Sequence, residues 1–407
     1  MNRDVGATYR EVLAVRDFRY VLIAETISVG GDQLSRVALS ILVFYRTSSA
    51  ALTGLTYGLT FLPTLLGSVF LAGLADHYPR RTIMSACSAV RAVLVAAVAI
   101  PGMPLWSVCL LVAGSTLFMG PFKSAQQALV PDLLRGRSYM LGMSLRTGLI
   151  QTAQLTGFAL GGGLVYFLTP AGGLLVDSGT FLTAAGLILM TSARTVSPAI
   201  GDSALSLRGL AVGLSAFAQD KRLLVLSMIV ALNLFHIVPE GVAAPYIAEL
   251  NMGDWAVAVV QASAPLGAAL GALLFGWLVP EQIQSKMVGP AAVGASVVLI
   301  PLFIPLGLTI ALVLFVFAGA LSSIYTMYAM AQVAQLAPVQ HRGRVSGVSS
   351  AVLQTANGLG PMLGGLVAEA SGAQSAIGLA GAASAVLAIG ITFAWTRTLR
   401  SPAAREE

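Results

Sequence analysis

The sequence predicts an all-α membrane protein with twelve transmembrane helices in two six-helix bundles. Three observations predict this fold: a composition poor in charge, twelve long apolar segments, and positive charge gathered on one side. Of the 407 residues, 57% are hydrophobic and only 10% are charged, and the mean hydropathy is +0.84. A soluble domain carries about 25% charged residues. A chain this poor in charge therefore needs the bilayer as its solvent.

The apolar segments are each long enough to cross the hydrocarbon layer, which takes about 20 residues of helix. We predict twelve spans, at residues 20–45, 52–75, 82–100, 104–128, 138–167, 170–192, 223–248, 255–279, 286–306, 308–335, 345–369 and 374–396. No segment has the short apolar core and small-residue cleavage site of a signal peptide. The first span is therefore expected to remain in the protein.

The distribution of positive charge predicts the topology. Of the 23 Lys and Arg residues, 18 fall in loops on one side of the membrane and only Arg46 falls on the other. Loops rich in Lys and Arg stay in the cytoplasm, so both termini and the central loop are expected there, with the chain in the inner (plasma) membrane. Because the net charge of +6 comes from scattered loops and not from one basic face, binding to nucleic acid is not expected.

The longest connection divides the chain into domains. We predict an N-terminal bundle at 1–192, a cytoplasmic linker at 193–222 and a C-terminal bundle at 223–407. Within the linker, the stretch from Leu205 to Ala218 is apolar enough to lie on the membrane surface. A simple tether between the bundles explains it equally well.

A weak internal repeat relates the two halves. The segment Leu129–Arg137 precedes span five, and the similar segment Leu336–Arg344 precedes span eleven. Both contain Pro and end in Arg-Gly-Arg, and a glycine-rich helix follows each of them. Two copies on the same side, six spans apart, predict parallel halves, an architecture found in transporters.

The cysteines and histidines indicate neither a disulfide framework nor a metal site. Cys87 and Cys109 lie in apolar segments, as small core residues do. The three histidines, at positions 77, 236 and 341, are scattered along the chain. No phosphate-binding loop of the Gly-x-x-x-x-Gly-Lys-Ser/Thr kind is present. We therefore expect no metal, no cofactor, no ATP hydrolysis and no enzymatic activity.

The loop after span two carries the most distinctive motif. Its pattern Gly-x-x-Asp-x-x-x-Arg-Arg is made by Gly73, Asp76, Arg80 and Arg81. In this motif and over nearly its whole length, the chain resembles the major facilitator superfamily. The likeness is strongest to the bacterial drug and siderophore exporters, including macrolide-efflux and enterobactin-exporter proteins. His77 and Pro79 stand where that family usually has Arg and Gly.

The physical chemistry of this loop agrees with a gate. Gly73 has no side chain, so two helices can touch there. Asp76 can accept hydrogen bonds at a helix N-terminus, where the helix dipole favours an anion. Arg80 and Arg81 stay in the cytoplasm and can pair with Asp76, although they also serve as plain topology anchors. The resemblance implies that this cluster closes the cytoplasmic gate.

Two glycine-rich helices are expected to pack closely against their neighbours. Exporters of this family often carry Gly-Pro followed by Gly-Gly on span five. Here Phe158 stands at the Pro position, while span eleven keeps the fuller form. The residues expected at these helix contacts are Gly157, Gly161, Gly162, Gly360, Pro361 and Gly364.

Nine ionisable residues lie inside the predicted spans: Glu25, Asp32, Arg36, Arg91, Lys123, Arg146, Asp177, His236 and Glu240. Each such residue costs about 2.5–3.5 kcal/mol to insert, so it usually faces a cavity and serves a function. Four acids matched by four bases predict internal pairing. Helix geometry predicts two local pairs, Asp32 with Arg36 and His236 with Glu240, because residues four apart share a face.

The resemblance implies that spans one, four, seven and ten line a central cavity. Asp32, Lys123, His236 and Glu240 are then the first candidates for the proton-coupling or substrate cavity, followed by Arg36, Arg91 and Arg146. We predict that Asp32 or Glu240 takes up and releases the coupling proton, because burial favours a neutral carboxyl and a nearby Arg favours the ionised one. A permanent structural ion pair is the alternative. Asp177 is expected only to cap or bond locally.

The resemblance implies secondary active transport, namely proton-coupled efflux of a small amphipathic drug or natural product by alternating access, with antibiotic resistance as its consequence. Aromatic residues such as Tyr325 and Tyr328 would line an apolar cavity or simply pack helices. A siderophore exporter, a lipid flippase or an importer of the same fold remains an alternative, and a membrane receptor or enzyme is a weaker one. The expected partners are the lipid bilayer, a small-molecule substrate and protons, and a monomer is expected.

Overall fold

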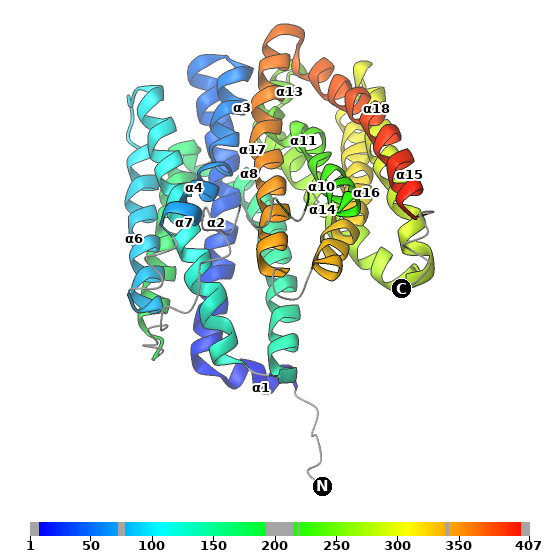
Figure 1. The fold of residues 1–407 in the computed structure, drawn as a ribbon. Coiled ribbons are helices and arrows are strands. Elements are labelled where there is room, and N and C mark those ends of the chain that lie inside the picture. Colours follow the sequence, from blue (N-terminus) through cyan, green and yellow to red (C-terminus); the bar gives the residue numbers. More distant parts are fainter. Residues whose placement is uncertain are drawn as a thin grey trace. The chain divides into compact units, whose positions relative to one another are not determined.

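The structure is a computed structural model, and it describes residues 8–71, 78–134, 136–192, 215, 217, 220–337 and 342–399. Within these ranges the regular structure is helical throughout and contains no strand (Figure 1). Ten helical segments of the described chain are each long and apolar enough to cross a membrane. The chain forms two compact units, Met1–Ala38 with Pro63–Ser203, and Leu39–Leu62 with Ala204–Glu407, here called unit 1 and unit 2.

Unit 1 holds the first six spans apart from the segment 39–62. Its helices are α1 (Tyr9–Ala14), α2 (Arg16–Thr47, which continues into unit 2), α4 (Pro63–Phe70), α6 (Arg80–Val98), α7 (Leu105–Leu133) and α8 (Gly136–Leu189). The long helix α8 is two spans joined by a sharp break. Thr169 there adopts φ 67° and ψ 164°, and Pro170 has no N–H to continue the helical hydrogen bonds. Spans five and six therefore meet at the position that the sequence predicts.

Unit 2 holds the other six spans. Its elements are α3 (Ala50–Gly58), α10 (Lys221–Ala231), α11 (Asn233–His236), α12 (Val238–Gly241), α13 (Ala243–Glu249), α14 (Trp255–Leu278), α15 (Glu281–Val297), η1 (Ile300–Phe303), α16 (Leu308–Leu336), α17 (Arg342–Ser371) and α18 (Ala373–Leu399). The short helices α10 to α13 together form span seven. Its interruptions lie at Leu232, Ile237 and Val242, and the last two flank the short helix that carries the predicted site residue Glu240. Interrupted helices of this kind often line transporter binding sites.

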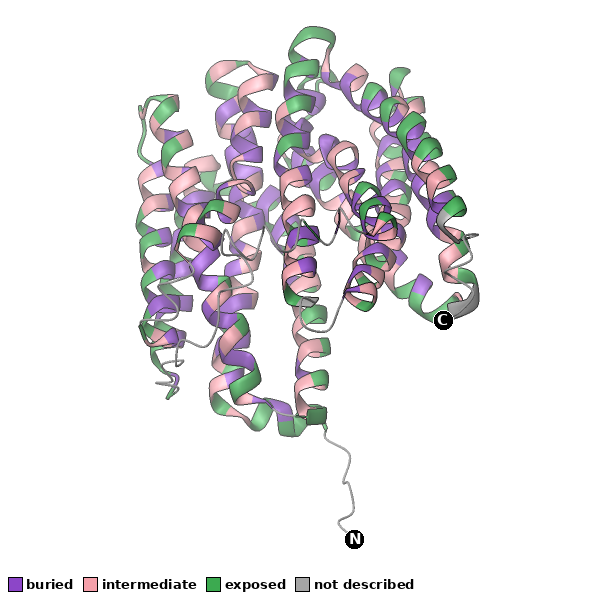
Figure 2. Ribbon diagram, in the orientation of Figure 1, coloured by how far each residue is buried: buried purple, intermediate pink, exposed green. Residues whose placement is uncertain are grey.

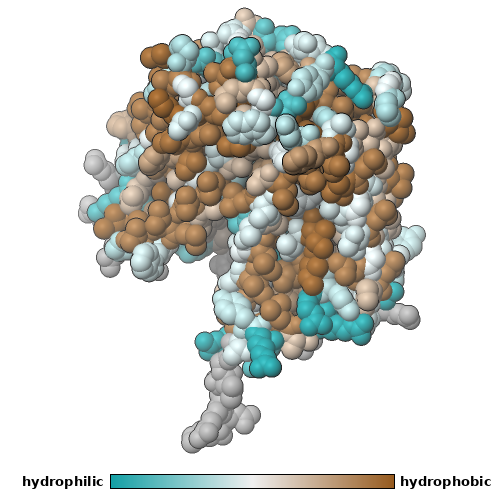
Figure 3. Space-filling view, turned by 180° about the vertical axis from the view of Figure 1, so that it is seen from behind, coloured by the Kyte–Doolittle hydropathy of each residue, from teal (hydrophilic) through white to brown (hydrophobic). Residues whose placement is uncertain are grey.

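All twelve predicted spans are present in the described part of the chain, so the predicted fold is confirmed. Helices α3 and α4 together make span two, the two arms of α8 make spans five and six, and α17 is span eleven. Large apolar side chains on the surface agree with a lipid environment. Trp277 is 84% exposed and Phe167 is 80% exposed, and exposed residues run along the length of helices such as α6 and α18 (Figure 2). Hydrophobic side chains cover most of the face in Figure 3, while hydrophilic ones gather at its upper and lower margins.

The internal repeat extends to helix packing. In unit 1, Gly157 of span five lies against the carbonyl oxygen of Gly30 in span one. In unit 2, Gly360 of span eleven lies against the carbonyl oxygen of Leu234 in span seven. A Cβ atom at either glycine would overlap that oxygen, so the close approach requires glycine. The same contact thus recurs six spans later, as parallel halves require.

The segment 39–62 packs with unit 2, although it belongs to the N-terminal half of the sequence. The predicted linker at 193–222 lies almost entirely outside the described residues, as does its apolar stretch from 205 to 218. The division into 1–192, 193–222 and 223–407 therefore stays a prediction.

Candidate functional site

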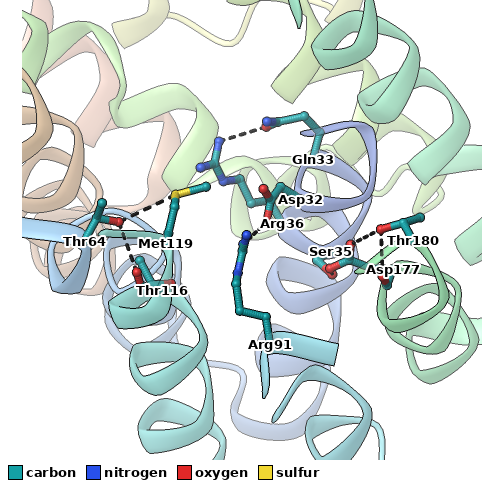
Figure 4. Close-up of polar contacts among 10 residues, drawn as sticks. All are labelled: Asp32, Gln33, Ser35, Arg36, Thr64, Arg91, Thr116, Met119, Asp177 and Thr180. Carbon is teal, nitrogen blue, oxygen red and sulfur yellow. Dashed lines mark hydrogen bonds and ion pairs between the residues drawn. The ribbon is translucent and has the colours of Figure 1, made fainter. Parts of the chain in front are cut away.

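The polar centre of unit 1 is built around Asp32 on α2 (Figure 4). Arg91 of α6 donates a hydrogen bond from Nη2 to Asp32 Oδ1 at 2.7 Å. The Arg91 side chain is 5% exposed, and that of Asp32 is 15% exposed. The guanidinium carbon of Arg91 also lies 4.1 Å from the centre of the Phe181 ring, a favourable cation–π arrangement. Spans one, three and six are thus joined by one arginine.

A second ion pair lies two helical turns earlier on α2. Arg146 of α8 donates from Nε to Glu25 Oε2 at 2.6 Å and makes a further hydrogen bond from Nη2 to Oε1. The same Nη2 lies 3.4 Å from Gln126 Oε1 on α7. Two parallel hydrogen bonds between a guanidinium and a carboxylate give strong and directional pairing. This pair ties span one to span five.

The prediction that Asp32 pairs with Arg36 on its own helix is wrong. The structure gives Asp32 a partner on another helix, Arg91, while Arg36 donates from Nη1 to Gln33 Oε1 at 2.8 Å. The prediction considered one helix alone, and neighbouring helices supplied a better-placed cation. The expectation that buried acids and bases pair is met by Asp32 with Arg91 and by Glu25 with Arg146.

Lys123 of α7 differs from these paired groups because its side chain is exposed. It nevertheless lies close enough to interact electrostatically with two acids and two arginines, Glu25, Asp32, Arg36 and Arg91. The cluster therefore brings residues of spans one, three and four together, with a lysine that reaches accessible space.

Asp177 of α8 is more than a local cap. Ser35 of α2 donates a hydrogen bond to Asp177 Oδ2, and Thr180 Oγ1 lies 3.0 Å from Asp177 Oδ1. The residue is only 1% exposed. The expectation of a purely local role is therefore wrong, because the carboxyl also joins span six to span one.

In unit 2, Glu240 contacts the segment 39–62. Tyr57 Oη of α3 donates to Glu240 Oε2 at 2.8 Å. Gln261 Nε2 of α14 lies 3.0 Å from the backbone oxygen of Glu240 and 3.0 Å from Ser40 Oγ. Glu240 thus lies where spans one, two, seven and eight meet.

His236 lies in a separate and fully buried polar group. Its Nδ1 atom lies 2.9 Å from the backbone oxygen of Leu232 and 3.0 Å from Tyr325 Oη. Ser296 Oγ lies 3.5 Å from Nε2 and 2.8 Å from Ser384 Oγ. The partners that the structure gives to His236 therefore differ from the predicted Glu240. Tyr325 has no exposed surface and packs helices, as does Tyr328, whose ring centre lies 6.3 Å from that of Trp395.

The arginines of the loop motif are held within unit 1. Arg80 pairs with Asp132 at the end of α7 and also donates to the Ala128 oxygen at 2.7 Å. Arg81 donates to the Thr191 oxygen at 2.7 Å. These bonds tie the start of span three to the ends of spans four and six. The expected partner Asp76 lies outside the described residues, as does Gly73.

The remaining predicted packing residues lie at helix contacts. A Cβ atom added to Gly161 would lie 3.1 Å from Val37, and one added to Gly364 would lie 2.6 Å from Val238. Gly162 is buried. Pro361 fills the space beside Gly241, and its carbonyl oxygen lies against Gly54.

The sequence analysis missed the neutral members of the site because it considered only ionisable residues. These members are Gln33, Ser35, Tyr57, Gln126 and Thr180. One signal was available in the sequence, since Ser35 follows Asp32 by three residues and shares its side of the helix. The others come from distant helices, and their contacts depend on how those helices pack.

The comparisons with known proteins agree with this architecture. The sequence pattern of the Major Facilitator Superfamily matches residues 21–312 and 241–407. No curated protein sequence matches the chain as a relative. The chain aligns over 95% of its length with 99% of a bacterial homolog of the human lysosomal transporter Spinster, in an inward-facing and unoccupied conformation, at 17% identity and a TM-score of 0.71.

Two further solved structures share the fold. A peptide transporter of the POT group, in complex with sulfate, aligns over 96% of both chains at 15% identity and a TM-score of 0.73. A bacterial homologue of the iron transporter ferroportin, in an inward-facing state, aligns over 94% of this chain and 98% of its own at 14% identity and a TM-score of 0.73. At such identities the likeness shows the fold alone. Because the superfamily pattern covers most of the sequence, the chain belongs to the Major Facilitator Superfamily of membrane transporters.

Proposed function

We propose that this transporter exports a small amphipathic molecule in exchange for protons, by alternating access of its two six-helix bundles. The observation that carries the proposal is the ion pair of Asp32 with Arg91, which joins two spans inside the membrane. Ion pairs at this depth are costly to insert and mark ion pathways and proton relays. Export and the amphipathic substrate are supported by the resemblance to drug and siderophore exporters.

A proton can act on this pair directly. Protonation of Asp32 removes the negative charge that holds Arg91, so the contact between spans one and three weakens. Asp32 keeps part of its surface accessible, and Lys123 beside it is exposed. Asp32 therefore has the accessible surface that a proton-accepting group requires. Glu240 is the second candidate, because its bond to Tyr57 joins spans seven and two.

The contacts of segment 39–62 support a conformation that is closed on the outer side of the membrane. In the proposed topology, with both termini in the cytoplasm of the cell and the chain in the plasma membrane, this segment lies in the outer half of the membrane. Tyr45 Oη donates to Asp254 at 2.5 Å, and Glu369 accepts hydrogen bonds from Ser49 and from the N–H of Ala51. These contacts hold the outer ends of spans one and two to spans eight and eleven. They must break when the transporter opens outward.

The loop motif is proposed to close the opposite, cytoplasmic side. The anchoring of Arg80 to Asp132, and of Arg81 to Thr191, supports a stiff loop end at the start of span three. Asp76 and Gly73 complete this gate in the proposal. The transporter is proposed to work as a monomer.

The decisive experiment measures proton-driven transport in vesicles. Asp32→Asn and Glu240→Gln keep the side-chain shapes but remove the titratable groups. We expect at least one of them to abolish proton coupling, while the exposed Glu11→Gln on α1 leaves it unchanged. Full coupling in both site variants would refute the proposal.

The substrate class is tested in the same vesicles. Structurally similar proteins are described as peptide, nucleoside and iron transporters, so the assay compares these classes with cationic drugs, siderophores and lipids. Accumulation of an amphipathic drug is the expected result, and transport of only a hydrophilic class would overturn it. Tags on both termini test the topology, which fails if they lie on opposite faces.

A further inference from the structure

Asp177 is the buried acid of unit 1 that the ion pairs do not use. It is 1% exposed, and it takes no part in the ion pairs made by Glu25, Asp32 and Asp132 within the described residues of unit 1. Its contacts are two hydroxyl groups, Ser35 Oγ from span one and Thr180 Oγ1 from its own helix (Figure 4).

The hydroxyl protons can be counted. Thr180 has one hydroxyl proton, and its oxygen lies 2.7 Å from the backbone oxygen of Asp177, closer than to Asp177 Oδ1 at 3.0 Å. Because a carbonyl oxygen can only accept, the Thr180 proton is donated to it. A carboxyl proton on Oδ1 would then complete the contact with Thr180 Oγ1, which otherwise shares its one proton between two acceptors. Ser35 donates to the other oxygen, Oδ2, so a protonated carboxyl satisfies every group.

The surroundings favour the same protonated form. An ionised carboxylate without a cation is expensive to bury, so such a group takes up a proton instead. The charged groups that act on Asp177 are Asp32 and Arg91. Arg91 is already bonded to Asp32, and a second carboxylate beside Asp32 would repel it. Arg91 is thus the cation that acts on Asp177, and it is already engaged by Asp32.

We infer that Asp177 is a second proton-holding carboxyl of unit 1, neutral while Asp32 is paired with Arg91 and held in that form by Ser35 and Thr180. The role of this proton in transport rests on the proposed function, whereas the protonation of Asp177 does not. When Asp32 takes up a proton and leaves Arg91, the arginine becomes available to Asp177. Asp177 can then release its proton to water, and the cluster keeps the same total charge.

Gly31 of span one leaves the space that the Asp177 carboxyl occupies. A Cβ atom added to Gly31 would overlap Asp177 Oδ1 and Thr180 Oγ1, whereas one added to the adjacent Gly30 would lie 3.6 Å from the Ala153 oxygen, an ordinary contact. Gly31 therefore lets the acid and its threonine lie directly on the backbone of span one. The two neighbouring glycines also form a matched pair of test sites.

The test is infrared spectroscopy of the purified full-length chain in lipid, following the C=O stretching band of a protonated carboxylic acid and its downward shift in D₂O. We expect the wild-type protein to show this band and Asp177→Asn to lose it. Asp32→Asn, which frees Arg91 for Asp177, is expected to weaken it. Asn retains the shape and bonding of the neutral acid, so the variant is expected to fold. Absence of the band in the wild type, or its persistence in Asp177→Asn, would overturn the inference.

Two milder changes act on the environment of the acid. Ser35→Ala removes one hydrogen bond to Asp177, and we expect the band to move to higher frequency. Gly31→Ala is expected to displace the carboxyl and shift the band, whereas Gly30→Ala leaves it in place. An unchanged band in both Ser35→Ala and Gly31→Ala would contradict the assignment.

Vesicle transport measured in the same variants separates this inference from the proposed function. If the band belongs to Asp177 and the wild-type chain transports without proton coupling, the proposed function falls and the assignment of the proton stands. If coupling is present and survives in Asp177→Asn, a role of Asp177 in carrying the transported proton is refuted.

Discussion

The two units share a packing scheme but differ in the chemistry of their polar centres. Span one of unit 1 carries Asp32, which pairs with Arg91. Span seven of unit 2, six spans later, carries His236, which contacts Tyr325 and Ser296. The ion pairs made by Arg80, Arg91 and Arg146 lie in unit 1, whereas the centre around His236 is built from hydroxyl groups, an imidazole and backbone oxygens.

This difference shows that one repeated scaffold can hold two kinds of polar core. Charge that can be neutralised by a proton can move helices, while neutral hydrogen bonds mainly fix their packing. We therefore expect variants in the charged centre of unit 1 to change transport and stability together. Variants in the neutral centre of unit 2 should change stability slightly and leave transport intact.

The largest effect is expected from Arg91→Leu. Removing one partner of a buried ion pair costs about 3–5 kcal/mol, because the other charge is left unpaired. We expect a strong drop in thermal stability in detergent and a loss of proton-driven transport. The double variant with Asp32→Asn should recover much of the stability, because no lone charge remains. A double variant as unstable as the single one would show that the pair is not the cause.

A smaller effect is expected from Gly54→Val in unit 2. The added side chain would overlap the carbonyl oxygen of Pro361 where α3 packs on α17, and overpacking costs about 1–3 kcal/mol. The measurement is thermal unfolding of the purified protein. Gly163→Ala is the control, since an added Cβ atom there meets no atom within 4 Å. Equal effects of both changes would rule out the close contact.

Glu369→Ala should have a still smaller effect. Glu369 accepts hydrogen bonds from Ser49 Oγ at 3.0 Å and from the Ala51 N–H at 3.1 Å, at the start of α3. Loss of such a helix N-terminal bond costs about 1 kcal/mol. Because the contact closes the proposed outer side, we also expect faster labelling of a cysteine placed at Thr53, which is 0% exposed in this structure. Glu369→Gln, which keeps an acceptor oxygen, should retain more of the stability.

The smallest effect is expected from Tyr325→Phe, which removes the hydroxyl group beside His236. Hydrogen bonds between membrane helices contribute about 0.6 kcal/mol on average, so stability should fall only slightly. Vesicle transport should remain at the wild-type level. A loss of transport as large as that of Arg91→Leu would break the distinction between the two centres.

The sequence predicted the spans well because each span is a local property of the chain. Apolar length and charged loops placed even the break at Thr169 and Pro170. The ionisable residues of the site were also predicted, because charge inside an apolar segment stands out in any sequence.

The partners of those residues were predicted poorly. Asp32 was expected to pair with Arg36 on its own helix, and it pairs with Arg91 on another. Asp177 was expected to act locally, and it bonds Ser35 across the helix interface. Such contacts depend on the rotation and depth of each helix, which a single sequence does not specify.

The connection between spans five and six has a mechanical consequence. Thr169 alone separates the two arms of α8, so this hairpin has no slack. Because no flexible loop separates the two spans, a displacement of span five is expected to displace span six as well. Span five is bonded to span one through Arg146 and Glu25. The same movement would separate the carboxyl of Asp177 from Ser35 and strain the ion pair of Arg146 with Glu25. The two hydrogen-bonded sites would then change together.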